Sequence, residues 1–232
     1  MLSIILPTYN ERENITPLVE AILGVVSEEI ELLIVDDDSP DRTWEVVEAL
    51  ERRFQGVRLI RRRGKKGLTA SLNEGLLRSK GKKLLWMDAD FSMPPEMVPH
   101  LSRCLDTYPV VIGSRYTEGG KDARNSFFPV LLSRWFNGLA KGLLGTVTDY
   151  TTGFVAARRE VWEQFGLSGR HGDYCIRFLY RAKCAGYPIH EIPYECRPRR
   201  IGHSKTFASL PQTLRHGKDY LWTLFSLWIA HA

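Results

Sequence analysis

The chain has 232 residues, of which 44% are hydrophobic and 25% are charged, and these fractions exclude a disordered or fibrous protein because they are those of an ordinary globular one. The length suits one substantial α/β domain. The net charge of +5 is spread unevenly, with basic clusters in residues 61–66 and 197–205, and it indicates an anionic partner. Composition alone leaves nucleic acid, anionic lipid and a substrate phosphate open, together with a basic face that is merely solvated.

The cysteines and the N-terminus both fit a reducing compartment. The cysteines lack C-x-x-C spacing and flanking histidines, which argues against a zinc site and against a redox couple; they are Cys104, Cys175, Cys184 and Cys196. The N-terminus begins with an apolar, strand-like run and shows neither the charged region nor the cleavable apolar segment of a signal peptide. We therefore do not expect export by that route.

The first half of the chain alternates β-rich runs with amphipathic stretches, which is the pattern of βαβ units and of a mostly parallel sheet. The expected strands are residues 2–6, 30–36, 57–61, 83–87 and 110–114. A first helix is expected to begin with Thr16 as its N-cap and Pro17 at its first helical position. Apolar residues at helical spacing predict further helices over residues 43–54 and 68–79. Because ligands of such sheets bind beyond the carboxyl ends of the strands, we expect functional residues there.

After residue 115 the pattern loosens into a helix from about residue 126 to 144, a strand over 153–157 and a helix over 173–185. From about residue 207 the chain reads as helical and contains an apolar run over 220–230, which spans only about 16 Å and cannot cross a membrane alone. The aromatic residues of this run suit a membrane interface, but a C-terminal helix that packs on the protein core would explain them equally simply. We therefore expect a domain over 1–206 and a C-terminal helical segment over 207–232 that contacts a membrane surface.

Two acidic clusters follow expected strands. Asp88 and Asp90 are separated by one small residue, so that both carboxylates can address a single Mg²⁺ or Mn²⁺ that bridges them to a substrate diphosphate. A D-x-D pattern alone is a weak signal. It gains weight from its place at the end of a strand and from the second cluster, residues 36–38, because adjacent carboxylates repel one another and rarely gather for stability alone.

The first expected strand ends in a turn, residues 7–11, which presents an aromatic face and polar tips to a nucleoside. A simple strand-to-helix turn with Asn10 as a local cap is the alternative. The loop of residues 64–67 lacks Walker spacing, and no G-x-G-x-x-G follows the first strand, so neither a P-loop nor a Rossmann site is expected. The absence of H-E-x-x-H and G-x-S-x-G argues against a zinc hydrolase and a serine nucleophile.

Ordered segments between residues 2 and 205 resemble the motifs of the dolichyl-phosphate (polyprenyl-phosphate) mannosyltransferases, a group of GT-A glycosyltransferases of family 2. These segments are residues 6–14, 35–43, 87–95, 113–116, 149–154 and 199–205. The resemblance implies an α/β GT-A fold, with a mostly parallel sheet flanked by helices; the expected C-terminal amphipathic or apolar helix lies beyond the resembling segments. It implies metal-dependent, inverting transfer of mannose from GDP-mannose to a polyprenyl phosphate at the cytoplasmic face of a membrane, to which the protein would be peripheral or anchored.

The resemblance also assigns residues to roles. The residues matching the donor nucleoside site are Pro7, Tyr9, Glu11, Val35 and Asp37. Those matching the metal and diphosphate site are Asp88, Ala89 and Asp90, with Ser92 as a further metal contact. Those around the donor and acceptor phosphates are Arg115, Arg199 and Lys205, with Ser133 near the acceptor phosphate. Asp90, Arg115, Arg199 and Lys205 are the expected catalytic residues. The nucleophile is an anionic phosphate oxygen, so no side chain has to remove a proton.

The sequence departs from the family pattern at several positions. Glycine is usual where Arg42 and Thr69 stand, and we expect both changes to be tolerated. The acceptor side is affected by Arg177, where a glutamate is frequent, and by Pro129, where a basic residue is usual. We expect compensation for Pro129 to come from one of two nearby arginines, Arg124 or Arg134.

Two other functions stay open at this stage. One is transfer to the same lipid from UDP-glucose or a UDP-amino sugar. Residues 39–41, however, resemble the mannosyl branch of the family more than the glucosyl branch. The other is a non-catalytic subunit that binds lipid or nucleotide. Nucleic acid is disfavoured as a partner, because the carboxylate clusters would repel its phosphate backbone. The resemblance also allows a membrane-anchoring subunit and does not specify the length of the polyprenol.

Overall fold

The computed structural model describes residues 1–124, 127–169, 172–201 and 210–230. Its strands are β1 (Leu2–Thr8), β2 (Ile30–Asp36), β3 (Val57–Arg61), β4 (Lys83–Trp86), β5 (Val110–Ser114), β6 (Lys121–Asp122), β7 (Val155–Arg158), β8 (Ile189–Pro193) and β9 (Glu195–Cys196). Its helices are α1 (Arg12–Val25), α2 (Thr43–Arg53), α3 (Leu68–Arg78), the 3₁₀ turn η1 (Pro95–Met97), α4 (Val98–Cys104), α5 (Phe127–Leu144), α6 (Arg159–Phe165), α7 (Asp173–Cys184) and α8 (Leu210–Ile229).

A seven-stranded sheet with the order β3-β2-β1-β4-β7-β5-β8 forms the centre of the molecule. Its neighbouring strands are parallel except around β7, which runs antiparallel to both β4 and β5. The short strands β6 and β9 pair separately. The α/β class with a mostly parallel sheet is confirmed, and all five strands expected in the first half are present within two residues of the expected ends.

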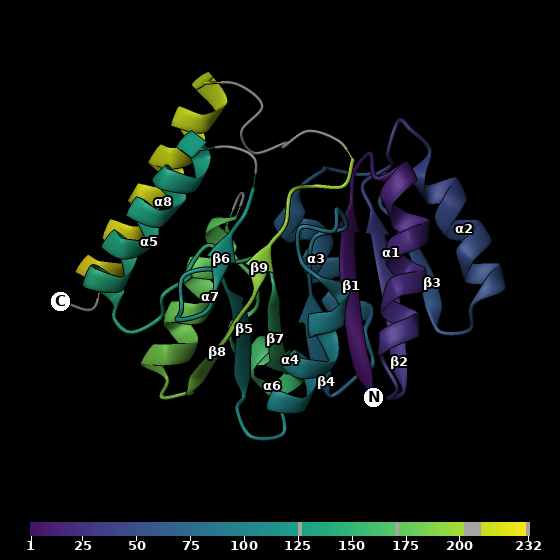
Figure 1. Cartoon of the computed structure of the whole chain (residues 1–232), viewed down its shortest axis with the longest axis horizontal. Helices are drawn as coiled ribbons and strands as arrows, with labels where there is room; N and C mark the ends of the chain where they lie inside the picture. The colour runs from purple at the N-terminus through teal and green to yellow at the C-terminus, as the bar shows by residue number, and fades with distance from the viewer. Residues whose placement is uncertain (125–126, 170–171, 202–209, 231–232) are drawn as a thin grey trace.

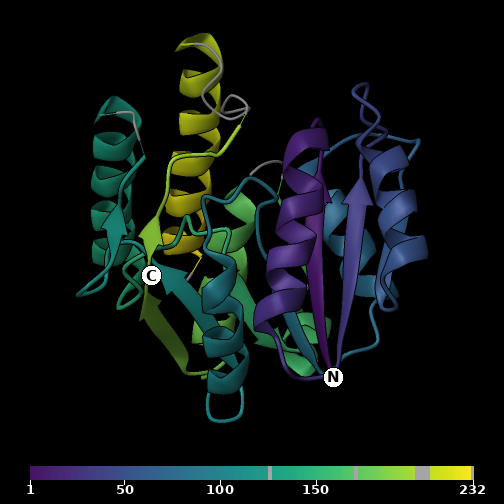
Figure 2. The same cartoon turned by 45° about the vertical axis from the view of Figure 1, so that its right-hand side comes forward.

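The sheet lies between two layers of helices (Figures 1 and 2). Alternate residues of β1 pack on opposite faces, with Ile5 on one face and Ile4 and Leu6 on the other. Helices α1, α2 and α4 cover the face of Ile4, and α3, α5, α6, α7 and α8 cover the face of Ile5. Strands buried on both faces are near-continuous apolar runs, which is why the sequence pattern located them so closely.

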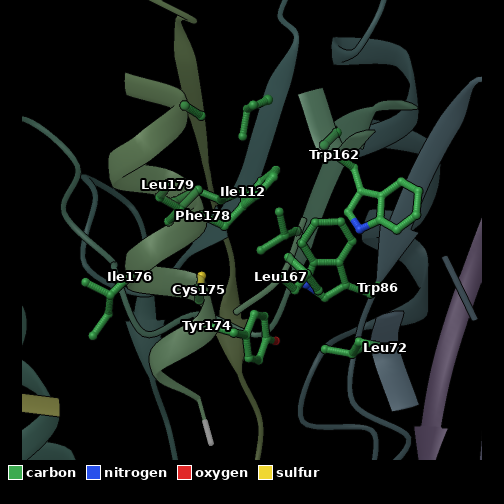
Figure 3. Packing of buried hydrophobic residues seen from close by; sticks show 14 of the residues in the cluster. Leu72, Trp86, Ile112, Trp162, Leu167, Tyr174, Cys175, Ile176, Phe178 and Leu179 are labelled. Carbon is green, nitrogen blue, oxygen red and sulfur yellow. The ribbon is translucent and has the colours of Figure 1, made fainter. Parts of the chain in front are cut away.

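The second face is built largely of aromatic and branched side chains (Figure 3). Trp86 from β4 meets Phe178 from α7 edge to face, with 5.6 Å between the ring centroids. Both side chains are fully buried, and Ile112 of β5 belongs to the same cluster. Helix α7 is thereby packed against β4, the strand that precedes Asp88 and Asp90.

The expected start of the first helix is wrong. Helix α1 begins at Arg12, so that Pro17 lies inside it rather than at its first position. The cap comes from a distant loop, since the backbone N–H of Glu11 donates to Thr43 Oγ1 at 2.9 Å and that of Arg12 donates to Asp41 Oδ2 at 3.1 Å. A cap supplied from some thirty residues away has no local sequence signal, and Thr16 offered the nearest local one.

Helices α5 and α8 lie side by side at one end of the molecule (Figures 1 and 2). The ring of Phe136 on α5 meets that of Tyr220 on α8 edge to face at 5.6 Å. Leu224 and Leu227 of α8 are buried in the core cluster of that face. In the part of the chain that the structure describes, no helix is long and apolar enough to cross a membrane.

Arg177, one of the departures from the family pattern, joins α7 to α8. Its Nη2 donates to Thr223 Oγ1 at 2.8 Å, and its Nε lies 3.3 Å from Asp173 Oδ2. Thr223 also donates to that carboxylate oxygen at 3.3 Å. Asp173 and Thr223 are buried, so the arginine compensates a carboxylate enclosed between two helices.

We expect Arg177→Met to lower the free energy of unfolding by about 1–3 kcal/mol, because the hydrogen bond of the guanidinium to Thr223 and its ion pair with the buried Asp173 are lost. Urea denaturation measures the loss, and hydrogen exchange should show weaker protection in α8. Arg181→Met is the matched control, since Arg181 lies one turn further along α7 and donates to Ser168 on the surface. Equal stability of the two variants would contradict this role for Arg177.

Candidate active site

The expected nucleoside residues meet where β1 and β2 end. Pro7 pairs with Val35 and Thr8 with Asp36 in the parallel register of these strands, and the N–H of Asp37 donates to the Thr8 carbonyl oxygen at 3.1 Å. The two sequence segments assigned to the nucleoside are thus neighbours in the sheet. The side chain of Val35 is fully buried in the core, so it leaves only main-chain atoms for a ligand.

Asp36 of the first acidic cluster stabilises the loops around it. Its Oδ2 accepts hydrogen bonds from Thr8 Oγ1 at 2.8 Å and from Ser39 Oγ at 2.6 Å, and its Oδ1 accepts one from the Ser39 N–H at 2.8 Å. The N–H of Asn10 donates to Ser39 Oγ at 3.0 Å. The carboxylate is fully buried and fixes the turn after β1 against the loop after β2, so its role is structural.

Asp37 is held by the basic loop that follows β3. One of its carboxylate oxygens accepts hydrogen bonds from Arg62 and from Ser71 Oγ, and the other accepts one from the Gly67 N–H at 2.7 Å. Arg61 pairs with Asp38 and lies over the ring of Trp44, 3.5 Å from its centroid. Part of the first basic cluster therefore compensates the acidic cluster of its own chain.

The aromatic residue of the first turn also faces this basic loop. Lys66 Nζ lies 4.5 Å from the centroid of the Tyr9 ring. Glu11 is buried, and its Oε2 accepts a hydrogen bond from Asn14 Nδ2 at 2.8 Å. Tyr9, Glu11 and Asp37 thus lie together on loops at the carboxyl edge of β1 and β2, each with a neighbour on this chain. From the positively charged loop of residues 62–67, Arg62 contacts Asp37 and Lys66 contacts Tyr9.

Arg42 shows how the loop between Asp37 and α2 closes without the usual glycine. It is the N-cap of α2 and adopts a left-handed conformation with φ of 62° and ψ of 35°, which glycine reaches at lower cost. Its N–H donates to the Ser39 carbonyl oxygen at 3.0 Å, which closes the turn. The structure therefore accommodates this departure.

The second acidic pair follows β4. Asp90 has only 2% of its surface exposed; its Oδ1 accepts a hydrogen bond from the Ser92 N–H at 3.0 Å, and its Oδ2 lies 3.0 Å from Arg199 Nη1. The carboxylate of Asp88 borders the loop before β7, because a Cβ on Gly153 would lie 3.6 and 3.7 Å from its two oxygens. These are ordinary contact distances, whereas the same Cβ would come within 2.9 Å of Met93 Cε, so a side chain at position 153 would first clash with Met93.

The donor atoms at this place fit a divalent cation. Carboxylate oxygens are the hard ligands that Mg²⁺ and Mn²⁺ prefer. Among the described residues, no group of three or more histidine, cysteine, aspartate or glutamate side chains could hold a metal ion. Mg²⁺ in proteins is commonly bound by one or two carboxylates together with water and phosphate oxygens, so Asp88 and Asp90 are residues that could hold such an ion.

A basic segment, residues 197–201, lies across the loop that carries Asp90. The N–H of Arg197 donates to the Ser92 carbonyl oxygen at 3.0 Å, and that of Arg200 donates to the Asp90 carbonyl oxygen at 3.2 Å. The guanidinium of Arg200 lies over the ring of Phe91, 5.4 Å from its centroid. The structure thus brings Arg199 and Asp90 together, as the sequence motifs suggested, whereas Lys205 lies outside the described residues.

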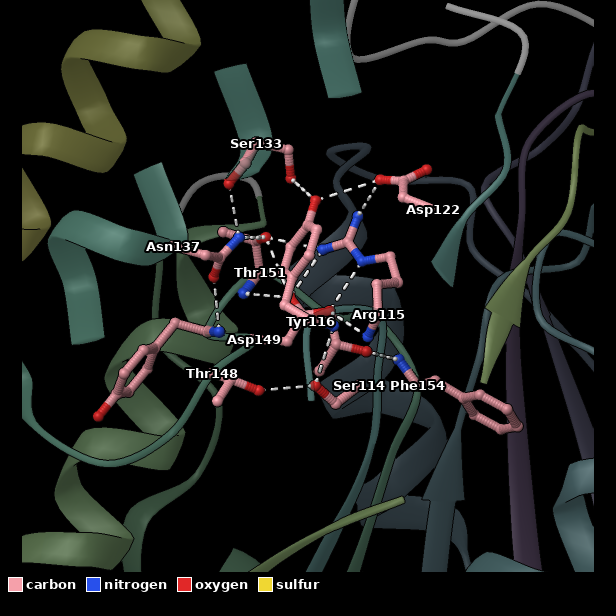
Figure 4. A network of polar contacts seen from close by, with 12 residues as sticks. Ser114, Arg115, Tyr116, Asp122, Ser133, Asn137, Thr148, Asp149, Thr151 and Phe154 are labelled. Atoms are coloured by element: carbon pink, nitrogen blue, oxygen red, sulfur yellow. Dashed lines mark hydrogen bonds and ion pairs between the residues drawn. The ribbon is translucent and has the colours of Figure 1, made fainter. Parts of the chain in front are cut away.

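Arg115 lies in a buried polar network rather than in the open (Figure 4). Its Nε and Nη2 donate to the two carboxylate oxygens of Asp149 at 2.8 and 2.7 Å, and Nη2 also donates to Thr151 Oγ1 at 2.8 Å. The arginine is 7% exposed and the aspartate fully buried. Although burial disfavours its charge, the Asp149 carboxylate keeps the pKa of Arg115 well above its ordinary value. Its charge is therefore largely compensated before any phosphate arrives.

Ser133 belongs to the same network (Figure 4). The hydroxyl of Tyr116 donates to Ser133 Oγ at 2.8 Å and lies 3.1 Å from Asp122 Oδ2, and that aspartate lies 3.6 Å from Arg115 Nη1. Burial raises the pKa of Tyr116, so the phenol stays protonated as a donor. The structure thus joins Arg115 and Ser133 through Tyr116, which the sequence motifs include without assigning it a role.

The two arginines expected to compensate for Pro129 differ in their surroundings. Arg124 pairs with Asp122 through Nε at 2.7 Å and Nη2 at 2.6 Å. Burial by itself raises the pKa of Asp122, but the guanidinium of Arg124 outweighs this effect, and the pKa is lowered. Arg134 is exposed on α5. Pro129 falls in the first turn of α5, where a missing N–H is tolerated. Asp122 lies outside every sequence motif, so no signal in one sequence marks it.

The comparisons with known proteins identify the family of the chain and several relatives. A model of glycosyl transferase family 2 matches residues 3–166. The dolichol-phosphate mannosyltransferase of Pyrococcus furiosus is 34% identical over 88% of this chain, which spans only 58% of that protein's length. The polyprenol monophosphomannose synthase of Mycolicibacterium smegmatis is 36% identical, over 89% of this chain and 81% of that protein.

A solved structure shares the fold. Glucosyl-3-phosphoglycerate synthase from Mycobacterium tuberculosis, in complex with Mn²⁺, uridine diphosphate and phosphoglyceric acid, aligns with a TM-score of 0.76 over 98% of this chain and 78% of that one. Its sequence identity of 21% limits the likeness to the fold. The α/β fold of this chain is therefore one that a solved structure shares.

Proposed function

Because the chain belongs to glycosyl transferase family 2, we propose that it transfers mannose from GDP-mannose to a polyprenyl phosphate, with inversion at the anomeric carbon. The observation that supports this most is the buried carboxylate of Asp90 beside Arg199, because a metal-bound diphosphate and an attacking phosphate both need charge compensation at one place. Two relatives at 34 and 36% identity are named for dolichol-phosphate and polyprenol mannosyl transfer.

In this proposal the donor lies along the carboxyl edge of β1, β2 and β4. Pro7, Tyr9, Glu11 and Asp37 would contact the guanosine, and Asp88 and Asp90 would hold Mg²⁺ or Mn²⁺ near its diphosphate. Ala89 and Ser92 belong to the same loop, and the Ser92 N–H orients Asp90. When bound, the ion stabilises the negative charge that develops on the leaving diphosphate.

The acceptor brings its own nucleophile. An anionic phosphate oxygen of the lipid forms a bond to the anomeric carbon while the bond from that carbon to the GDP oxygen breaks, and GDP leaves with the electron pair. Attack from the face opposite GDP converts the α-linked donor into a β-linked product. Arg199 and Lys205 hold the phosphates, since guanidinium and ammonium groups compensate their charge. Arg115 orients Tyr116 and Ser133 toward the acceptor phosphate. No side chain has to act as a base.

We further propose that α5 and α8 rest on the cytoplasmic leaflet of a membrane, with residues 207–232 as the membrane-facing segment beside a catalytic unit over 1–206. Large apolar side chains on both helices are exposed; they are Phe127, Phe128, Leu131, Trp135, Trp222, Phe225, Trp228 and Ile229. Apolar and aromatic side chains on adjacent helices suit the boundary between headgroups and acyl chains. A lipid phosphate could then reach the site without leaving the membrane, and the proposed surface is also where an anchoring subunit would bind.

We expect Trp222→Ser to weaken binding to vesicles of phosphatidylcholine and phosphatidylserine by about tenfold or more, because transfer of a large side chain into an apolar phase is worth about 1.5–3 kcal/mol. Trp222 has 74% of its surface exposed, so the change should leave stability unaffected. Leu77→Ser is the matched control, since Leu77 is 72% exposed on α3. Co-sedimentation with vesicles measures both variants, and equal loss in the two would argue against the proposed surface.

The function is tested by incubating the protein with a short polyprenyl phosphate, Mg²⁺ and radiolabelled GDP-mannose, UDP-glucose or a UDP-amino sugar in separate reactions. Label should appear in the extracted lipid with GDP-mannose and disappear when EDTA removes the metal. Label in the lipid from a UDP-sugar but not from GDP-mannose would mean that the donor is a UDP-sugar and that the acceptor is a polyprenyl phosphate as proposed. Failure of every donor to label lipid would instead favour the non-catalytic binding subunit.

A further inference from the structure

The ion pair between Arg199 and Asp90 occupies an atom that the proposed metal would use. Arg199 Nη1 lies 3.0 Å from Asp90 Oδ2, and the other carboxylate oxygen accepts the Ser92 N–H. Both oxygens of Asp90 therefore have a partner on the chain. A cation that binds Asp90 has to share Oδ2 with the guanidinium or displace it.

The two positive charges compete because the place is enclosed. Asp90 is 2% exposed and the Arg199 side chain is 28% exposed, so solvent screens their surroundings only in part. Two like charges this close repel one another appreciably at the effective dielectric constant typical near a protein surface, and a divalent ion doubles that interaction. A metal ion that arrives without a diphosphate therefore has to overcome electrostatic repulsion by Arg199.

The main chain holds Arg199 in this position. Arg197 and Arg200 donate backbone hydrogen bonds to Ser92 and to the Asp90 carbonyl oxygen on the same loop. Asn14 Nδ2 donates to the Ile201 carbonyl oxygen at 3.1 Å and so ties the end of this segment to α1. The guanidinium cannot move far from Asp90 unless its own side chain rotates toward another anion.

We propose that Arg199 couples metal binding to donor binding, acting as a resident counter-ion of Asp90 that yields to the metal only when a diphosphate offers the guanidinium another partner. A diphosphate accepts two parallel hydrogen bonds from an arginine, so Arg199 can turn from the carboxylate to the donor as the metal takes its place. This inference rests on the proposed function, since it takes Asp88 and Asp90 as the metal ligands. It adds an order: metal binds tightly only together with the nucleotide.

The test measures binding of Mn²⁺ by electron paramagnetic resonance of the free ion, with and without GDP. The native protein should bind Mn²⁺ weakly alone and much more tightly with GDP. Arg199→Gln keeps a hydrogen-bond donor beside Asp90 but removes the charge. We expect it to bind Mn²⁺ alone at least about tenfold more tightly, a change of about 1.4 kcal/mol, and to show a smaller enhancement by GDP. Because coupling is reciprocal, Mn²⁺ should enhance GDP binding by the same smaller factor.

Two further variants separate this role from a general effect of charge. Arg197→Gln removes the same charge from the same segment, but Arg197 pairs with Glu96 on the surface, so the affinity for Mn²⁺ alone should stay near that of the native protein. Arg199→Lys keeps a positive charge beside Asp90 and should also keep weak binding. A rise of equal size in Arg197→Gln and Arg199→Gln, or no rise in Arg199→Gln, would overturn the inference.

Failure of the proposed function would look different. In that case the native protein would bind no Mn²⁺ even with GDP or UDP present, and both ideas would fall together. If the native protein binds Mn²⁺ with GDP while Arg199→Gln binds it no more tightly alone, the inference about Arg199 fails and the proposed metal site stands. Circular dichroism and urea denaturation of each variant confirm that the comparison is made between folded proteins.

Discussion

Asp90→Asn should lower mannosyl transfer by about a thousandfold or more while leaving the protein folded. The stabilisation of a leaving diphosphate by a metal ion is worth several kcal/mol, and about 4 kcal/mol corresponds to a thousandfold in rate. The amide keeps an oxygen for the Ser92 N–H, which donates to Asp90 in the native protein. It removes the charge that holds both the proposed metal and Arg199. The rate is measured as labelled lipid formed from GDP-mannose at saturating metal.

The control for Asp90→Asn is the same chemical change away from the site. Asp106 follows α4 and pairs with Lys83, which donates to it and lowers its pKa. Asp106→Asn should keep transfer within about twofold of the native rate, because a surface ion pair contributes little. Retained activity in Asp90→Asn at all metal concentrations would show that this carboxylate is not a metal ligand.

Asp149→Asn should lower the free energy of unfolding by about 3–5 kcal/mol, because removing one partner of a buried ion pair leaves the other charge uncompensated. Asp149 is fully buried and also accepts the backbone N–H groups of Arg115 and Thr151. The asparagine can keep part of these bonds but cannot balance the guanidinium. Urea denaturation followed by circular dichroism gives the difference in stability.

A double variant tests whether the loss comes from the unpaired charge. Arg115→Gln combined with Asp149→Asn removes both charges and leaves two amides that can bond to each other. It should be more stable than Asp149→Asn alone, although still below the native protein. The stability of Arg115→Gln alone completes the comparison. If the loss in the double variant equals the sum of the losses in the two single variants, the pair is not the coupled unit that its geometry suggests.

Much of the fold followed from the sequence because the central strands are buried on both faces. The runs around Ile5 and Val35 are nearly continuous in apolar residues, and residues 30–36, 57–61 and 110–114 match the observed strands. The GT-A fold implied by the sequence motifs is confirmed by the match to a solved glycosyltransferase. The start of α1 could not be predicted, because its caps come from Asp41 and Thr43 across a loop.

The site was predictable as a set of motifs but not as a set of contacts. Spacing alone placed Asp88 and Asp90 at a strand end, yet it could not show that Asp36 is used to fix two loops or that Arg62 holds Asp37. These partners lie far apart along the chain, and a charged residue looks the same in sequence whether it meets a ligand or another side chain. Only the fold decides which charges remain for a substrate.

The central claim is that the acidic pair after β4 holds a cation against the donor diphosphate. Crystals of the protein grown with GDP and Mn²⁺ test it most directly through the anomalous signal of manganese. We predict one peak bound by Asp88 and Asp90 on one side and by the two phosphates of GDP on the other, with Arg199 turned toward a phosphate. Bound GDP with no manganese at these carboxylates, or with the metal held elsewhere, would contradict the account.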